Sequence, residues 1–199
     1  MSRLSENLTA GEGRPSPPAE YSLEERRMLL RVAHESITSS FANQDLPRVS
    51  PCAHLAEARG VFTTLYLQGG LRGCVGYASP VAPLFRAVAE TARAAAFDDS
   101  RFWPVTEMEA SELEISLSVL SRLVPIRAGE VEVGRHGLVA SFASHRGLLL
   151  PQVPVECGWD RETFLEQTCH KAGLPRDAWR KDATLEAFTA EVFGDGDVG

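Results

Sequence analysis

The sequence predicts an α+β fold in which helices cover an antiparallel sheet. Residues 61–77 and 131–142 each show two extended runs around glycines, as in hairpins, and residues 112–120 alternate strictly between apolar and polar side chains. No strand-helix-strand unit repeats, which disfavours a doubly wound parallel sheet. No linker rich in Gly, Ser or Pro interrupts residues 21–193, so two lobes, if present, must share strands.

The N-terminal part divides into a tail, a helix and a connection. Residues 1–19 are rich in Ser, Gly, Pro and Glu, so we expect a disordered tail. Ser22 and Glu25 have the spacing of a capping box, and the apolar residues that follow recur at helical intervals. The spacing predicts a long amphipathic helix that ends at about Asn43. Residues 44–60 hold prolines and small residues without periodicity, which is typical of an irregular surface connection.

A hairpin and a second helix are expected next. Residues 61–68 are β-branched and aromatic, Gly69 and Gly70 can turn the chain with positive φ, and residues 71–77 resume an extended pattern. Residues 81–97 carry apolar side chains at helical intervals among strong helix formers, which predicts a helix. The polar run 98–100 ends it.

The central and later segments favour strands. The alternation at 112–120 predicts a strand with one wet face. Residues 131–133 and 138–142 flank a Gly-Arg-His-Gly turn, which predicts another hairpin. Residues 148–155 follow as an extended edge that prolines interrupt.

The C-terminal segment is expected to add one helix and one strand. Residues 161–172 have a helical pattern that ends at Gly173, a residue suited to the left-handed position after a helix. Residues 185–193 return as a last strand. We therefore predict one folded domain over residues 20–194 and a frayed tail over residues 195–199.

Composition narrows the classes of partner. The 199-residue chain has 20 Lys and Arg against 27 Asp and Glu, a net charge of -7 that opposes binding to duplex nucleic acid. Its apolar runs fall far short of the roughly 20 residues that cross a bilayer, and its first residues lack the apolar core of a signal peptide. We therefore expect a cytoplasmic protein without a membrane partner.

The cysteines are expected to be free thiols, and one of them has a distinctive context. Cys52, Cys74, Cys157 and Cys169 are far apart, without the Cys-x-x-Cys spacing of a zinc site or a redox dithiol. Cys74 lies in Leu-Arg-Gly-Cys-Val-Gly, where Arg72 could stabilise a thiolate and the glycines permit close approach. Cys74 is therefore a candidate nucleophile or ligand, although a strand position is equally compatible with core packing.

Three further residues are candidates for the same site. Asp99 and Arg101 follow the second helix, where they could orient an anionic or amide-bearing substrate or simply pair with each other. His136 lies between the glycines of the expected hairpin, where it could act as a general acid or base or be ordinary surface. Neither metal nor cofactor motifs occur, and the hydrolase elbow, phosphate loop, dinucleotide fingerprint and metalloprotease patterns are absent.

These motifs resemble the AMMECR domain family. The resemblance spans nearly all of residues 21–193, in order and at compatible spacing. The matching blocks are residues 71–76, 94–102, 113–120, 133–138, 148–153, 158–160 and 171–174. The later blocks resemble the bacterial branch called protein A of the AmmeMemoRadiSam system.

The resemblance implies a fold, a site and partners. It implies a larger lobe built from both chain ends, a smaller α/β lobe, and the arginine-cysteine motif at the cleft between them. It also implies a Memo-like protein and a radical-SAM protein as partners, and it favours a functional role for Cys74. It implies no established reaction or cofactor.

Two functions follow as hypotheses. In the first, an enzyme uses Cys74 as nucleophile or transient ligand, Arg72 and Arg101 hold an anionic small-molecule substrate, and Asp99 and His136 tune protonation. In the second, a non-catalytic adaptor or scaffold docks a Memo-like or radical-SAM partner in its cleft.

Overall fold

A computed structural model describes residues 19–42, 44–45 and 52–198 of the chain. Apart from Ala19, the expected disordered tail at residues 1–19 lies outside the described residues. Within the described part, no helix has both the length and the apolar character needed to cross a membrane.

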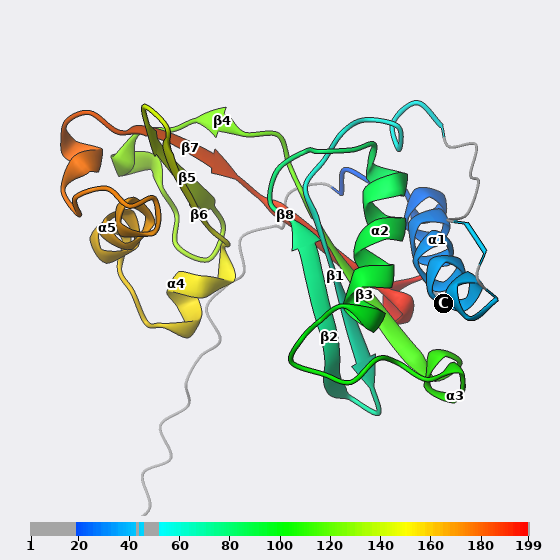
Figure 1. The fold of residues 1–199 in the computed structure, drawn as a ribbon. Coiled ribbons are helices and arrows are strands. Elements are labelled where there is room, and N and C mark those ends of the chain that lie inside the picture. The colour runs from blue at the N-terminus through cyan, green and yellow to red at the C-terminus, as the bar shows by residue number, and fades with distance from the viewer. Residues whose placement is uncertain (1–18, 43, 46–51, 199) are drawn as a thin grey trace, which may run out of the picture.

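The fold is α+β, as the sequence predicts, but it contains two antiparallel sheets rather than one (Figure 1). The larger lobe holds a four-stranded sheet of order β2-β1-β3-β8, and the smaller lobe holds a four-stranded sheet of order β4-β7-β5-β6. In chain order the helices and strands are α1 (Leu23–Phe41), β1 (Val61–Leu67), β2 (Gly70–Tyr77), α2 (Leu84–Phe97), α3 (Glu107–Ala110), β3 (Leu113–Leu120), β4 (Val124–Pro125), β5 (Gly137–Phe142), β6 (His145–Leu149), α4 (Gln152–Glu156), α5 (Arg161–Lys171), β7 (Thr184–Phe188) and β8 (Ala190–Gly194).

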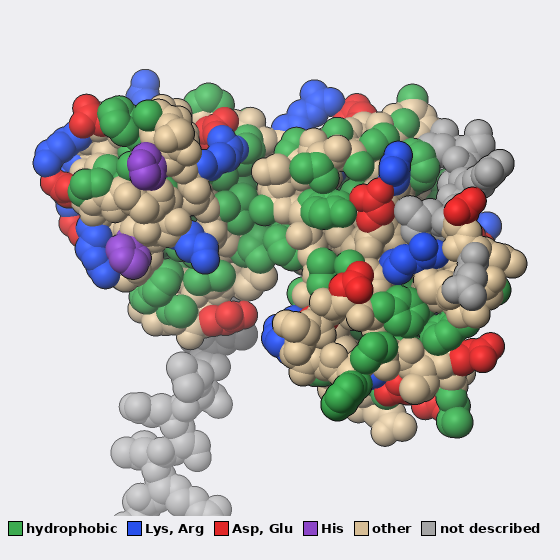
Figure 2. Space-filling view, viewed as in Figure 1, with side chains coloured by type: hydrophobic (Ala, Val, Ile, Leu, Met, Phe, Trp, Pro, Cys, Tyr) green, Lys and Arg blue, Asp and Glu red, His purple; other side chains and the backbone are tan. Residues whose placement is uncertain are grey.

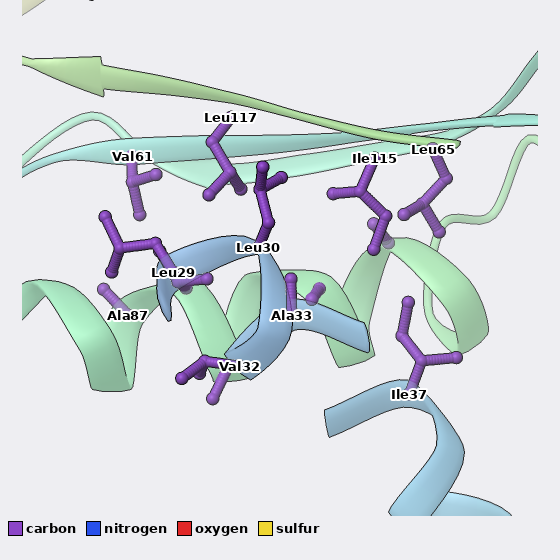
Figure 3. Close-up of a cluster of buried hydrophobic side chains, with 14 of the residues drawn as sticks. Leu29, Leu30, Val32, Ala33, Ile37, Val61, Leu65, Ala87, Ile115 and Leu117 are labelled. Atoms are coloured by element: carbon purple, nitrogen blue, oxygen red, sulfur yellow. The ribbon is translucent and has the colours of Figure 1, made fainter. Parts of the chain in front are cut away.

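The larger lobe is built on one buried layer between its sheet and helices α1 and α2. Apolar side chains of β1 and β3 point toward the two helices, which fill the space beneath them (Figure 3). The labelled residues of this layer are Leu29, Leu30, Val32, Ala33, Ile37, Val61, Leu65, Ala87, Ile115 and Leu117. The capping box expected at Ser22 and Glu25 is present and begins α1. The helices thus cover one face of the sheet and leave its other face open.

The smaller lobe has a separate core. Helix α5 packs on β5 and β6, and Phe164 and Leu165 of this helix are fully buried there with Leu138. The helix ends as predicted, since Gly173 has φ 74°.

The two lobes are joined by the C-terminal segment, which contributes one strand to each sheet. The expected single strand at 185–193 is divided at Thr189: β7 pairs with β4 and β5, whereas β8 pairs with β3. The larger lobe is therefore built from both chain ends. A third apolar cluster lies at the junction, where Leu120 and Phe188 are buried with Phe62 packed against them.

The prediction of a hairpin at residues 131–142 is wrong. Val131 is buried in the smaller core but is not in a strand, and the next residues close a local turn in which His136 N donates to Glu132 O. The true hairpin joins β5 to β6 through Ala143, whose φ is 52°. The sequence drew attention to the glycines, but Gly137 is needed for packing, because a Cβ there would lie 2.2 Å from the Phe188 ring.

Two further expectations are corrected near the chain's end. The extended edge expected at 148–155 is a strand only to Leu149, after which Pro151 is the N-cap of the short helix α4 and Pro154 lies within it. Residues 195–197 form a 3-10 helix instead of a frayed tail. Asp195 anchors it, because its carboxylate accepts a hydrogen bond from Ile115 N at 2.7 Å and contacts His34 Nε2 at 3.0 Å.

Candidate functional site

A β-bulge decides which face of the larger sheet carries Cys74. Near the turn, Leu71 pairs with Tyr66, but the next pair in the ladder is Gly73 with Leu65, so Arg72 is an extra residue. Without this insertion, Cys74 would pair with Thr63 on the buried face. The shifted register pairs Cys74 with Thr64, which turns the thiol to the open face and Gly73 toward α2.

The thiol of Cys74 is half-buried and makes no disulfide. Thr64 Oγ1 donates to Cys74 Sγ at 3.4 Å, and Ser116 lies across from Thr64 in the same row of the sheet. In the adjacent row, Phe62 covers Gly76 and packs against the apolar cluster that joins the lobes. Cys74 therefore lies one row from the place where the smaller lobe meets the open face.

The molecule is hollowed between the lobes on one side. Figure 2 shows this hollow below the connecting region, with hydrophobic side chains over the connection itself. In Figure 1, strand β2 is the edge of the larger sheet on the side of the hollow, while α1 and α2 lie on the far side of that sheet.

Asp99 and Arg101 dock the segment after α2 onto the free edge of β2. Asp99 Oδ2 accepts a hydrogen bond from Cys74 N at 2.9 Å, and Arg101 Nη2 donates to Cys74 O at 3.2 Å. The two side chains also pair with each other through two hydrogen bonds, at 2.7 Å and 2.9 Å. Arg101, then the Cys74 amide, hold the pKa of Asp99 well below its ordinary value, so this carboxylate stays ionised. Three of the candidate site residues thus lie together at one strand edge.

Arg72 is engaged away from the thiol. Its Nε and Nη2 donate to the two carboxylate oxygens of Glu109 at 3.1 Å and 3.2 Å, and its guanidinium also donates to Trp103 O and Pro104 O. Arg72 and then Thr106 N lower the pKa of Glu109 from 4.5 to about 2. The arginine therefore fixes the 103–109 segment.

His136 belongs to a different cavity. Its Nδ1 accepts a hydrogen bond from Glu132 N at 3.0 Å, and its ring lines a cavity at the lobe junction whose described lining does not include Cys74. Burial, and next the charge of Arg135, lower the pKa of His136. The structure brings together Cys74, Asp99 and Arg101, with Arg72 beside them, but it does not bring His136 to them.

The sequence did not predict the side chains that contact Cys74 and Arg72. Thr64 and Glu109 carry no motif, and only the bulged register and the path of the 103–109 segment bring them to Cys74 and Arg72. Among the described residues, no group of three or more His, Cys, Asp or Glu side chains is placed to hold a metal ion.

The fold and this site define a two-lobed α+β domain with a free thiol at the edge of its larger sheet. The sequence model of the AMMECR1 family matches residues 30–193, so the chain belongs to the AMMECR1 family. A protein of Thermococcus onnurineus is 43% identical over 180 residues, which cover 83% of this chain and 87% of the relative. Protein MK0488 of Methanopyrus kandleri is 40% identical over 183 residues, which cover 86% and 88% of the two chains.

A solved structure supports the same assignment. The crystal structure of the uncharacterized protein PH0010 from Pyrococcus horikoshii matches with a TM-score of 0.64 and 41% sequence identity. The match covers 83% of this chain and 89% of that chain. The α+β fold and the family are therefore shown independently by structure and by sequence.

Proposed function

We propose that the protein is a cysteine-centred enzyme in which Cys74 acts as nucleophile or transient ligand toward a small anionic substrate. The single observation that carries this proposal is the position of a free, half-buried thiol on an open sheet face, where Sγ accepts from the hydroxyl of Thr64 and the backbone carbonyl of the same residue accepts from Arg101. A thiol in core packing has no such access. We expect it to act in the cytoplasm, where thiols stay reduced.

Arg101 is the group best placed to hold the anion. Its side chain is 56% exposed, and its hydrogen bonds to Asp99 and to Cys74 O orient it. The pKa of Arg101 is raised by Asp99 first, and the charge of a Cys74 thiolate also contributes, so the two groups are within electrostatic reach. Asp99 positions Arg101 and the strand, while Arg72 acts at a distance by holding the neighbouring segment.

Paired alkylating reagents test the role of the thiol and the arginine together. The rates for anionic iodoacetate and neutral iodoacetamide are measured at each cysteine by peptide mass spectrometry. Cys52 and Cys157 are exposed references, and Cys169 is a buried one. At Cys74, Arg101→Gln should reduce the iodoacetate-to-iodoacetamide rate ratio about fivefold, as about 1 kcal/mol for a charge pair near 4 Å in water implies.

The controls separate this role from a change in folding. Arg86 is a similarly exposed arginine of α2, and Arg86→Gln should leave the ratio at Cys74 unchanged. The ratio at Cys52 should be the same in all three proteins. Alkylation of Cys74 as slow as that of Cys169 would sink the proposal.

A non-catalytic adaptor is the second candidate, and one observation favours it. Trp103 is 88% exposed and Met108 is 78% exposed, both on the segment that Arg72 holds in place. Exposed large apolar side chains of this kind are typical of contact surfaces. The resemblance to protein A of the AmmeMemoRadiSam system makes a Memo-like protein and a radical-SAM protein the partners to try.

Direct titration of each purified partner into this protein decides between the candidates. The adaptor proposal expects binding that Trp103→Ser weakens and that Val81→Ser, at another exposed apolar residue, leaves unchanged. Absence of binding to both partners at high micromolar concentration contradicts the adaptor. Turnover by the isolated chain that Cys74→Ser abolishes supports the enzyme.

A further inference from the structure

A second site lies at the lobe junction, away from the thiol. A cavity of about 430 Å³ is lined by segments of both lobes. Arg59, before β1, and Arg122, after β3, come from the larger lobe, whereas His136 and Phe188 come from the smaller lobe. Its size falls within the roughly 300–1,000 Å³ typical of small-molecule sites.

Arg59 is the observation that points to a ligand. Its side chain is only 7% exposed, and its Nη2 donates to Glu20 and Glu57 at 2.6 Å and 2.9 Å. Its Nε is buried without a hydrogen-bond partner among the described residues. A buried guanidinium N–H left unpaired costs roughly 1–3 kcal/mol or more, and a ligand acceptor that reaches it from the cavity would recover that free energy.

A second donor faces the same cavity. Because His136 Nδ1 accepts from Glu132 N, the neutral ring carries its proton on Nε2, which remains available as a donor. Arg122 and Arg135 add two exposed guanidinium groups at the rim. The cavity therefore presents N–H donors from both lobes.

The charge balance favours a single negative charge on the ligand. Three arginines line the cavity against one carboxylate, that of Glu20. The rest of their positive charge is compensated from outside the lining, since Glu57 pairs with both Arg59 and Arg122, and Glu132 pairs with Arg135. Three arginines thus face three carboxylates, and surroundings without net charge suit a monoanion better than a phosphate dianion.

Apart from Ser121 and Thr189, the rest of the lining is apolar. Phe188, Val124, Ile126 and Ala187 line the same cavity. A ligand that fills it must bury an apolar body against these side chains while its anionic head meets the arginines.

We infer that the lobe-junction cavity binds a small organic carboxylate, with its head group on Arg59 and His136 and its apolar body against Phe188. This site is distinct from that of Cys74 and does not depend on the proposed function. Because donors from both lobes hold one ligand, occupancy also stabilises the junction between them.

Isothermal titration calorimetry with three matched probes tests the inference on the full chain. Phenylacetate carries the proposed head and body, phenylacetamide lacks the charge, and phenyl phosphate carries a dianionic head. Phenylacetate should bind at least about tenfold more tightly than phenylacetamide, because charge-assisted hydrogen bonds to arginine are the stronger kind. Equal affinity for the acid and the amide, or no heat at millimolar phenylacetate, overturns the inference. Preference for phenyl phosphate overturns the carboxylate assignment.

Substitutions then locate the site. Arg59→Lys keeps the charge that faces Glu20 and Glu57 but removes the Nε donor, and it should weaken phenylacetate binding about tenfold. Should that variant fail to fold, Arg122→Ala and His136→Phe carry the test, each with an expected loss of about threefold. Arg86→Ala and Cys74→Ser should leave binding unchanged, and a loss in Cys74→Ser that matches the loss in Arg59→Lys contradicts a separate site.

Discussion

The edge of β2 and the lobe junction use arginine in opposite ways. At the edge, Arg72 donates to Glu109 and to two carbonyl oxygens of a segment of its own chain. At the junction, Arg59 is more deeply buried than Arg72, and yet its Nε has no partner within the described chain. Arg72 therefore stabilises the fold through hydrogen bonds to its own chain, whereas the Nε of Arg59 is left as a donor for a ligand.

The comparison teaches that a motif and a site need not coincide. The Leu-Arg-Gly-Cys segment attracts attention, but most of its polar groups, together with Asp99 and Arg101, satisfy one another and the edge of the sheet. What remains available there is the thiol and the exposed part of Arg101. Variants that disturb each region separately can sharpen this contrast.

The largest effect is expected at Gly73, which holds the edge strand against helix α2. A Cβ at this residue would lie 2.2 Å from Ala95 O, a backbone atom that cannot rotate away. Gly73→Ala should therefore lower the free energy of unfolding by about 3 kcal/mol or more, at the upper end of the range for overpacking. Urea denaturation followed by circular dichroism measures the change.

A glycine in open space provides the control for this substitution. A Cβ at Gly129 would meet no atom within 4 Å, and its φ lies outside the left-handed region. Gly129→Ala should change stability by less than about 1 kcal/mol. Similar losses in both variants would contradict the close packing of β2 on α2.

The second effect concerns the structural arginine. Arg72→Ala removes a guanidinium that is 14% exposed and takes away the donor to Glu109 Oε1 and to two carbonyl oxygens. We expect a loss of about 2–3 kcal/mol, as for charged hydrogen bonds. A double-mutant cycle with Glu109→Gln should return a coupling free energy of at least about 1 kcal/mol. Additive losses would show that the pair contributes nothing beyond its separate contacts.

Much of the fold could be predicted from local pattern. Helix α1 with its capping box, the β1-β2 hairpin, the alternating strand β3 and helix α5 all follow from periodicity and turn residues, which act over a few neighbours. Within the hairpin, however, the positive φ angles are at Gln68 and Gly69 rather than at Gly69 and Gly70. The wrong prediction at residues 131–142 arose because a glycine that forms a hairpin turn and a glycine that makes room for an aromatic ring look the same in the sequence. Only the contact of Gly137 with Phe188 distinguishes these two roles, and the two residues lie far apart in the sequence.

The site was only partly predictable for a similar reason. The sequence grouped Cys74, Asp99 and Arg101, but it left open whether the thiol is packed or accessible. One inserted residue, Arg72, decides that question by shifting the register, and no local signal marks a bulge. The Arg59 cavity escaped notice because its lining comes from segments far apart in the chain, of which only the turn with His136 had drawn attention in the sequence.

The third effect is a pH dependence at the edge of β2. The pKa of Glu109 is lowered from 4.5 to about 2 in the folded chain, chiefly by Arg72. A carboxyl with a depressed folded pKa contributes stability above its unfolded pKa and loses it as pH falls toward the folded value. Unfolding measured from pH 5 to pH 2 should therefore show a loss at this site of roughly 1–2 kcal/mol, allowing for partial exposure.

Glu109→Gln isolates this contribution. The glutamine retains an oxygen to accept from Thr106 N, so the helix cap survives while the titrating group is gone. The variant should be less stable than the wild type near pH 7, and the difference should shrink as pH falls toward 2. A difference that stays constant over this range would show that Glu109 and Arg72 are not electrostatically coupled.

The smallest effect is expected at Arg122, and it completes the comparison between the two regions. This arginine lines the junction cavity, but it is 72% exposed and pairs only across the surface with Glu57 at 3.0 Å. Exposed pairs of this kind contribute about 0.2–1 kcal/mol, so Arg122→Ala should leave the urea midpoint nearly unchanged. Arg72→Ala is the matched substitution, because it also removes an arginine side chain. At the edge of β2, however, the arginine donates its hydrogen bonds to groups of its own chain. If Arg122→Ala were as destabilising as Arg72→Ala, Arg122 would stabilise the fold as Arg72 does. The contrast between the arginines of the cavity and those at the edge of β2 would then be wrong.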